Sequence, residues 1–288
     1  MYQIEIPETY ADSTKLLVNT LRVEPTNPEV TPDVVNVGRA TISRQDVISF
    51  LTGLPDESVD LIITDPAYSG MNQHLMLGKG RIVGKYNEKE TGEKWFTEFH
   101  DTPENYRVFL QQCHRVMKPN RHIFVMFDSF SMLTLAPELR RAFNVKNVLT
   151  WDKVNIGMGH YFRRQSEFII FASKGKRPLS RRDIPDIWKI KRLHRAAYPT
   201  QKPVELFEAM IASSKTKDDK EFVVCDPFAG SGSSALAAIK QGASFIGCDV
   251  SAKAMTICSK RLQEFADSGV DLYQPKAAFD VALQKKFW

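Results

Sequence analysis

The chain has few cysteines, and their spacing argues against two common uses of cysteine. Cys113, Cys225, Cys248 and Cys258 are scattered along 288 residues, and none forms a C-x-x-C pair. The usual zinc sites need closely spaced cysteines, and disulfide frameworks belong to small oxidised domains. We therefore expect neither a disulfide nor a bound metal, and a reducing compartment such as the cytoplasm.

Long apolar runs are also missing. No uncharged apolar stretch approaches the roughly 18 residues of a membrane-spanning helix. The first residues, MYQIEIPETYADS, lack the basic and then apolar pattern of a signal peptide. The composition, 43% hydrophobic and 25% charged, is ordinary for a globular chain. We expect one large or two modest globular domains without a membrane partner.

Short apolar runs alternate with helix-like segments from about residue 40 onward. This alternation predicts a doubly wound, mostly parallel α/β fold, because strands that are apolar throughout are typically covered on both faces. We expect strands at 58–64, 121–127, 146–151, 167–172, 221–226 and 243–249. We expect helices at 103–117, 130–142, 203–214, 232–241 and 252–267. Residues 71–100, rich in Gly, Lys and Glu, are predicted to form a long mobile loop.

A glycine-rich turn follows the strand that ends at Asp226, in the stretch VVCDPFAGSGSSALAAIK. Gly230 and Gly232 let the backbone approach a ligand, and the amides at the start of the next helix face it. The following strand ends at Asp249, where a carboxylate can accept ribose hydroxyls. The Gly-Lys-Ser/Thr ending of a nucleotide P-loop is missing. The turn alone leaves open a dinucleotide, S-adenosylmethionine, or a turn that only packs helix on strand.

A second motif, DPAY, follows the predicted strand VDLIIT. The exocyclic amine of a nucleobase is a poor nucleophile, because its lone pair is delocalised into the ring. Asp65 and the carbonyl of Pro66 supply two acceptors that can turn this lone pair toward a methyl donor, largely by orientation. Tyr68 supplies a face on which a base extruded from a duplex can stack. Together with the glycine-rich turn, this motif favours methyl transfer over a plain Asp-Pro turn.

In this order the motifs resemble the permuted (β-class) DNA amino-methyltransferases, over roughly residues 40–265. The family's Asp-Pro-Pro-Tyr motif is matched by Asp65, Pro66, Ala67 and Tyr68, with alanine in place of the second proline. Its F-x-G-x-G motif is matched at 228–232, and its P-T-Q-K-P signature at 199–203. The resemblance implies a seven-stranded-type methyltransferase sheet with a small basic target-recognition insertion. It also implies S-adenosylmethionine as cofactor, bound by Asp46, Thr200, Gln201, Lys202, Pro203, Asp226, Phe228, Gly230, Ser231, Gly232 and Asp249.

A basic segment lies between the two motifs. Residues 173–202 contain ten Lys or Arg and two Asp, a net charge of +8, whereas the whole chain carries +5. Such a segment is typical of a solvated loop or of a polyanion-binding surface. The family places its target-recognition region here, which favours DNA. We expect some of the following to contact DNA: Lys174, Lys176, Arg177, Arg181, Arg182, Lys189, Lys191, Arg192 and Arg195.

The sequence therefore predicts an S-adenosylmethionine-dependent, site-specific methyltransferase that acts on a flipped base of double-stranded DNA. The resemblance favours adenine N6, because position 65 is Asp and not Ser. The alternatives are cytosine N4, a catalytically silent DNA-binding relative and RNA as substrate. A nicotinamide oxidoreductase leaves DPAY and PTQKP unexplained. Relatives suggest a homodimer, and the sequence identifies no restriction nuclease partner. The expected divisions are an arm (1–38), a catalytic half (39–172), a recognition region (173–198), a cofactor half (199–267) and a tail (268–288).

Overall fold

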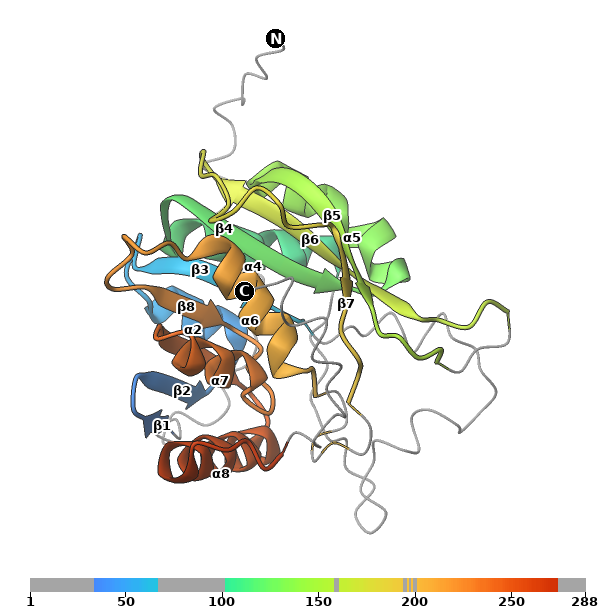
Figure 1. The fold of residues 1–288 in the computed structure, drawn as a ribbon. Coiled ribbons are helices and arrows are strands. Elements are labelled where there is room, and N and C mark those ends of the chain that lie inside the picture. The colour runs from blue at the N-terminus through green and yellow to red at the C-terminus, as the bar shows by residue number, and fades with distance from the viewer. Residues whose placement is uncertain are drawn as a thin grey trace. The chain divides into compact units, whose positions relative to one another are not determined.

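A computed structural model describes residues 34–66, 102–157, 161–193, 196, 198 and 201–273. Within these residues one nine-stranded sheet has the order β1-β2-β9-β8-β3-β4-β6-β5-β7 (Figure 1). Its strands are β1 (Val34–Val37), β2 (Ala40–Arg44), β3 (Val59–Thr64), β4 (Met117–Phe127), β5 (Asn144–Asp152), β6 (Ser166–Lys174), β7 (Ile187–Lys189), β8 (Val223–Asp226) and β9 (Ser244–Asp249). The helices are α2 (Val47–Gly53), α4 (Pro103–Val116), α5 (Ser129–Ala142), α6 (Val204–Ser214), α7 (Ser233–Lys240) and α8 (Ala252–Ser268).

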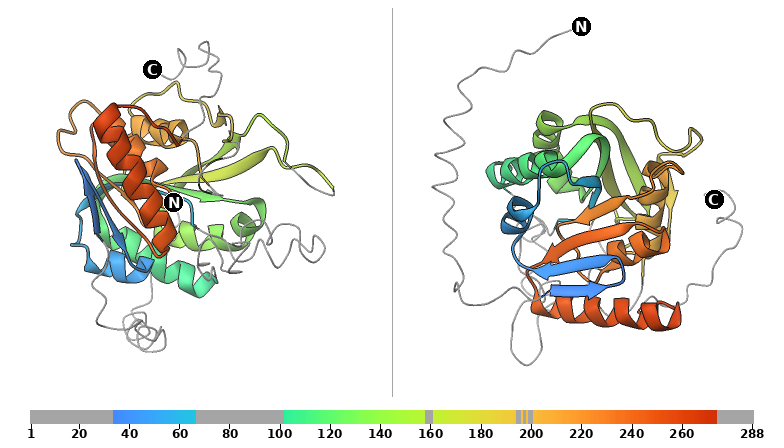
Figure 2. Two further views of the ribbon diagram at one scale, coloured as in Figure 1. Left: turned by 90° about the horizontal axis from the view of Figure 1, so that it is seen from below. Right: turned by 90° about the vertical axis from the view of Figure 1, so that its left-hand side faces the viewer.

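The sheet is mostly parallel. Strands β2, β9, β8, β3 and β4 are neighbours and run in one direction. β6 runs antiparallel between β4 and β5, while β7 continues the sheet parallel to β5. At the other edge β1 pairs antiparallel with β2, and this hairpin lies beside α8 (Figure 2). The seven strands from β2 to β5 in the sheet order agree in number with the seven-stranded type that the resemblance implied, and β1 and β7 extend the edges. Six of the seven were predicted by position.

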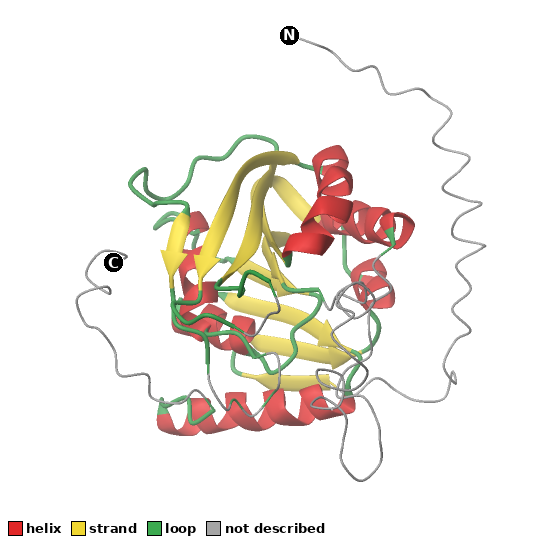
Figure 3. Cartoon of the chain, turned by 90° about the vertical axis from the view of Figure 1, so that its right-hand side faces the viewer, coloured by secondary structure: helices red, strands yellow, loops and turns green. Residues whose placement is uncertain are grey.

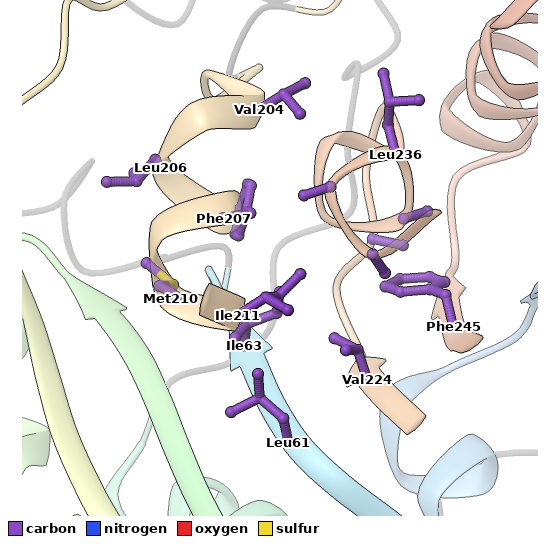
Figure 4. Close-up of a cluster of buried hydrophobic side chains, with 14 of the residues drawn as sticks. Leu61, Ile63, Val204, Leu206, Phe207, Met210, Ile211, Val224, Leu236 and Phe245 are labelled. Carbon is purple, nitrogen blue, oxygen red and sulfur yellow. The ribbon is translucent and has the colours of Figure 1, made fainter. Parts of the chain in front are cut away.

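Helices cover both faces of the sheet (Figure 3). Leu61 and Ile63 of β3 belong to the apolar cluster of α6, α7 and α8, part of which Figure 4 shows. Ile62, which lies between them, belongs to the cluster of α2, α4 and α5, and so does Val59, which lies before an irregularity in the strand register. The apolar side chains of β3 therefore meet a helical layer on each face of the sheet. The expected doubly wound α/β fold is confirmed.

The predicted elements are all present, with ends shifted by a few residues. β4 begins at Met117, earlier than expected, and β8 begins at Val223, later than expected. The structure adds β1, β2, β7 and α2, which the sequence did not predict. No helix among the described residues is long and apolar enough to cross a membrane.

A buried carboxylate joins the two central strands. Asp60, at the start of β3, is almost fully buried and accepts a hydrogen bond from the backbone N–H of Val223 at 3.0 Å. It also pairs with Lys118 and Arg121, each at 2.8 Å. A buried carboxylate is costly unless donors surround it, and here three donors do. Asp60 thus holds β8 beside β3, so that the ends of both strands lie at one edge of the sheet.

Candidate active site at the carboxyl edge of the sheet

Five adjacent parallel strands each have an aspartate at their last residue or within two residues after it. Asp249 and Asp226 are the last residues of β9 and β8, and Asp65 and Asp128 directly follow β3 and β4. Asp46 lies two residues beyond β2 and caps α2 by accepting from two backbone amides. Parallel strands end at the same edge of a sheet, so four of the predicted site residues lie along this edge: Asp46, Asp65, Asp226 and Asp249. Two of them precede the basic segment 173–202 in the sequence and two follow it.

Asp65 is paired with a lysine that lies 137 positions later in the chain. The ammonium of Lys202 contacts Asp65 Oδ2, and the two side chains are only 15% and 21% exposed. The backbone carbonyl of Lys202 accepts a hydrogen bond from Ser233 Oγ at 2.8 Å, at the start of α7. Burial raises the pKa of Asp65, and Lys202 counteracts this rise. Lys202 therefore links the DPAY motif to the glycine-rich turn.

A second acid–base pair extends this network. Glu167, near the start of β6, lies 3.9 Å from Lys202 and 3.0 Å from the ammonium of Lys153. Burial pushes the pKa of Glu167 up, but Lys202 and Lys153 outweigh it and hold the pKa below its usual value. The sequence did not single out Glu167 or Lys153. The sequence feature that could have pointed to Glu167 is that it is the single carboxylate at the start of the apolar run EFIIFA.

The glycine-rich turn is bound to Asp249. The backbone N–H of Gly230 donates to Asp249 Oδ2 at 2.9 Å, and that of Ser251 donates to Oδ1 at 2.9 Å. Gly232 has a φ of +79°, and a Cβ there would lie 2.5 Å from Cys258 Sγ, so only glycine fits. Burial raises the pKa of Asp249. Ser251, not Asp249, caps α8 with its side chain, so Asp249 serves the turn and keeps further acceptor capacity.

Asp226 is the most deeply buried of these carboxylates. It accepts from the backbone N–H of Phe228 at 3.0 Å and from Ser234 Oγ at 2.6 Å. Burial raises its pKa to about 7. One oxygen thus accepts from the turn and the other from the first turn of α7, so Asp226 fixes the shape of the connection between β8 and α7.

A buried arginine braces the turn from α8. Arg261 is fully buried and donates to the backbone carbonyl of Ser231 at 3.1 Å and to Ser233 Oγ at 2.9 Å. Its guanidinium also forms a two-pronged pair with Asp271. The sequence did not predict this residue, because an arginine in the middle of a helix carries no distinguishing pattern.

Two residues of the segment before α6 fit a bound cofactor. Gln201 donates through Nε2 to the carbonyl of Tyr273 at 3.1 Å, while its buried Oε1 has no hydrogen-bond partner within the described residues. Tyr198 is buried, and its ring would lie 3.7 Å from a Cβ at Gly230. Burial raises the pKa of Tyr198, so its hydroxyl stays protonated. A buried acceptor without a donor suits the amino group of S-adenosylmethionine, and the spare capacity of Asp249 suits its ribose.

The structure divides the basic segment between opposite edges of the sheet. Lys174 donates to the carbonyls of His114 and Met117, and Arg177 pairs with Asp219, so both are engaged inside the protein. The residues that follow Arg177 run along the end of α6, where Ser180 Oγ donates a hydrogen bond to the carbonyl of Ala212. The exposed side chains at this amino edge are Lys176, Arg181 and Arg182. At or beyond the end of β7, at the carboxyl edge, lie the exposed Lys189 and Lys191 and the half-buried Arg192.

Other predicted residues complete this placement. Pro66 is buried behind Asp65, and Pro203 is the residue before α6. Ala67, Tyr68, Thr200 and Arg195 lie outside the described residues.

Comparisons with known proteins identify the family and the fold of the chain. The chain matches the DNA methylase (N6/N4) family over residues 59–260. It is 30% identical over 228 residues to the Type II methyltransferase M.HhaII of Haemophilus parahaemolyticus, covering 72% of this chain and 95% of that protein. It is 26% identical over 256 residues to the Type II methyltransferase M2.DpnII of Streptococcus pneumoniae, covering 81% and 93%.

Solved structures have the same fold. A complex of M1.HpyAVI with SAM (S-adenosylmethionine) has a TM-score of 0.54 at 20% identity, covering 77% of this chain and 99% of that one. The cytosine-N4-specific PvuII DNA methyltransferase has a TM-score of 0.56 at 15% identity, covering 81% and 93%. The match to the family spans most of the described sheet, including both glycines of the turn and Asp65. The chain therefore belongs to the N6/N4 DNA methylase family.

Proposed function

We propose that the protein transfers a methyl group from S-adenosylmethionine to the N6 amine of adenine in double-stranded DNA. The observation that carries the proposal is the contact of Lys202 with Asp65 on one side and with Ser233 on the other. This contact joins the acceptor for the target amine to the turn that holds the methyl donor. An enzyme that moves a group between two ligands needs such adjacency.

Asp65 orients the target amine. Its carboxylate and the carbonyl of Pro66 accept the two amine hydrogens, so that the lone pair points away from both acceptors and out of the base plane. Tyr68 stacks on the extruded base. The gain comes mainly from holding the amine in this geometry, and the acceptors stabilise the positive charge that develops on nitrogen.

When bound, the cofactor would supply an electrophilic methyl group on its sulfonium. It would leave as the neutral thioether once the C–S bond breaks, and the methylated amine would then lose one proton to water. Gly230 and Gly232 permit close approach of the backbone, Asp249 accepts the ribose hydroxyls, and Gln201 Oε1 accepts from the amino group. Asp226 and Arg261 hold the turn in shape through the bonds described above.

We favour adenine over cytosine because position 65 is an aspartate. In the DNA amino-methyltransferases that the chain resembles, aspartate at this position of the motif favours methylation of adenine N6. The test is nucleoside analysis by mass spectrometry of DNA from cells that express the protein, beside cells that express Asp65→Ala. We expect N6-methyladenine with the wild type and none with the variant. N4-methylcytosine would assign the other base, and no modified base would indicate a silent DNA-binding relative.

Binding measurements separate loss of chemistry from loss of the fold. Asp65→Ala is expected to bind S-adenosylmethionine with nearly wild-type affinity, because the carboxylate faces the amine. A variant that loses both methylation and cofactor binding would contradict this role.

A further inference from the structure

The residues that follow α8 turn back along that helix. Gly269 has a φ of +70°, and its N–H closes the helix on the carbonyl of Phe265 at 2.8 Å. Asp271 then pairs with Arg261, which lies well inside α8 and donates to the carbonyl of Ser231 in the glycine-rich turn. The segment 269–273 is therefore connected to the turn through one side chain, although no motif in the sequence assigns it a role.

A single carboxylate holds this segment in place. Asp271 Oδ1 accepts hydrogen bonds from Arg261 Nε at 3.0 Å and from the backbone N–H of Tyr273 at 3.1 Å, and Asp271 Oδ2 accepts from the Arg261 guanidinium at 2.6 Å. The side chain of Arg261 is fully buried and that of Asp271 is 14% exposed. A buried ion pair is costly to break, because the remaining charge is left without a partner. Asp271 therefore fixes the backbone of Tyr273 relative to the turn that Arg261 braces.

The carbonyl of Tyr273 determines how the amide of Gln201 is oriented. Gln201 Nε2 donates to this carbonyl at 3.1 Å, and the glutamine is buried. An amide can rotate to exchange its oxygen and nitrogen, but a carbonyl oxygen can only accept, so it selects the nitrogen. Gln201 Oε1 is the atom that remains, and it is buried without a hydrogen-bond partner among the described residues. The bond to Tyr273 thus leaves an acceptor, not a donor, for a ligand.

This free acceptor suits one group of the cofactor. Gln201 precedes Lys202, whose carbonyl accepts from Ser233 at the start of α7, so the acceptor belongs to a segment bound to the end of the turn. The amino group of S-adenosylmethionine is an ammonium at neutral pH and can only donate. It is matched by the oxygen of Gln201 and repelled by the nitrogen that a rotated amide would present. A glutamine free to rotate would bind this group less well, because part of its population would present the wrong atom.

We propose that Asp271 and the backbone of Tyr273 position Gln201 so that its Oε1 accepts a hydrogen bond from the amino group of the cofactor. The inference rests on the proposed function, which places Gln201 Oε1 against that group. It extends the cofactor site beyond α8 into the tail, which the motifs of the family do not reach. The first residues of the tail then contribute to the selection of the cofactor by its amino acid part.

The test compares two ligands that differ in the amino acid part. S-adenosylhomocysteine carries the amino group, whereas 5′-methylthioadenosine keeps the adenosine and the thioether without the amino acid. Dissociation constants are measured by calorimetry, without DNA and without methyl transfer. A residue that positions Gln201 should affect the binding of the first ligand and not of the second, whereas a residue that only stabilises the turn should affect both.

Two substitutions at one position isolate the backbone of Tyr273. Tyr273→Pro removes the N–H that donates to Asp271, Tyr273→Ala keeps it, and both remove the ring. We expect the proline variant to bind S-adenosylhomocysteine about 10-fold more weakly than the alanine variant, because a hydrogen bond to a charged group is lost. Their affinities for 5′-methylthioadenosine should differ by less than about twofold. If Tyr273→Pro does not fold, Asp271→Glu, which keeps the charge opposite Arg261 but moves the acceptor, should lower the same preference.

A second set of variants shows whether the effect passes through Gln201. Gln201→Ala should weaken the binding of S-adenosylhomocysteine about 10-fold, and adding Tyr273→Pro should cost less than about a further twofold. Leu272→Ala removes a neighbouring side chain that is 68% exposed and should leave both affinities at wild-type values. Unfolding temperatures without ligand confirm that each variant is folded.

Three results would contradict the inference. Equal weakening of both ligands by Tyr273→Pro, or additive losses in the double variant, would overturn the proposal and leave Asp271 as a support of the turn. Equal affinity of the proline and alanine variants for S-adenosylhomocysteine would also overturn it, if Gln201→Ala lowers that affinity. Wild-type affinity of Gln201→Ala for this ligand would instead overturn the proposed placement of the amino group, and the inference with it.

Discussion

Replacing Lys202 by methionine should shift the acidic limb of the methylation pH profile to higher pH. Burial raises the pKa of Asp65, and the contacting ammonium of Lys202 holds that pKa down. Without the ammonium, the pKa of Asp65 rises further. If Asp65 must be ionised to accept the target amine, a higher pH is then needed for the same activity.

The size of the effect follows from the contact. Two unit charges about 4 Å apart attract by about 4 kcal/mol at an effective dielectric constant of 20. Both side chains keep some solvent exposure, so about half of this, about 2 kcal/mol, is a reasonable expectation. At a fixed pH on the acidic limb, 2 kcal/mol corresponds to about a 30-fold lower kcat/KM.

The assay is kcat/KM for DNA from pH 5 to 9 at saturating S-adenosylmethionine, with cofactor affinity measured separately by calorimetry. The matched control is Lys153→Met, which removes an equally buried ammonium that pairs with Glu167 and not with Asp65. A profile of Lys202→Met with an unmoved acidic limb would refute the reasoning. So would an equal shift in Lys153→Met. If Lys202→Met weakens only the affinity for S-adenosylmethionine, Lys202 contributes to cofactor binding and not to the ionisation of Asp65.

Three further predictions concern the turn, its buried carboxylate and the basic segment. Asp249→Ala should weaken cofactor binding by about 1.5–3 kcal/mol in a calorimetric titration, because charge-assisted hydrogen bonds are lost. Asp226→Asn should unfold at a higher temperature than the wild type at pH 8. Burial raises the pKa of Asp226 to about 7, so ionising it as pH rises from about 4 to 7 costs folding free energy that the amide avoids. Lys189→Ala with Lys191→Ala should weaken DNA binding in fluorescence anisotropy and lower the salt slope by about 1–2 units.

Each of these has an outcome that contradicts it. Unchanged cofactor affinity in a folded Asp249→Ala protein would remove that residue from the site. The difference in unfolding temperature between Asp226→Asn and the wild type should become smaller as the pH falls toward 4. If it does not, ionisation of the Asp226 carboxyl is not the cause of the difference. The control for the Lys189 and Lys191 double variant is Arg181→Ala with Arg182→Ala, at the amino edge of the sheet. An equal loss of DNA affinity in the two double variants would mean a general charge effect.

The fold could be predicted because the central strands are apolar on both faces. The run VDLIIT of β3 meets a helical layer on each side, so its pattern carries the topology. β2 and β7 gave no such signal. ATISR of β2 alternates with exposed positions at the sheet margin, and β7 has three residues.

Residues of the site could be named from motifs, but their contacts could not. The pairing of Lys202 with Asp65 depends on β3 and α6 lying together, which the sheet order decides. Likewise, the basic segment 173–202 is one continuous stretch in the sequence. The chain crosses from one edge of the sheet to the other within it, so Arg181 and Lys189 lie at opposite edges.

The bond between Asp60 and Val223 also has a consequence for synthesis. The two residues are 163 positions apart, and at about 5–20 residues per second a ribosome needs about 8–33 s to make the chain between them. During that interval β3 can pair with β4, but its other edge has no partner, and an apolar edge of this kind attracts other chains. The nascent protein also carries Asp65 before it carries the turn for the methyl donor. The polypeptide thus cannot bring Asp65 and the glycine-rich turn together until residues 226–232 have been translated. We expect the free edge of β3 to be exposed to aggregation until then.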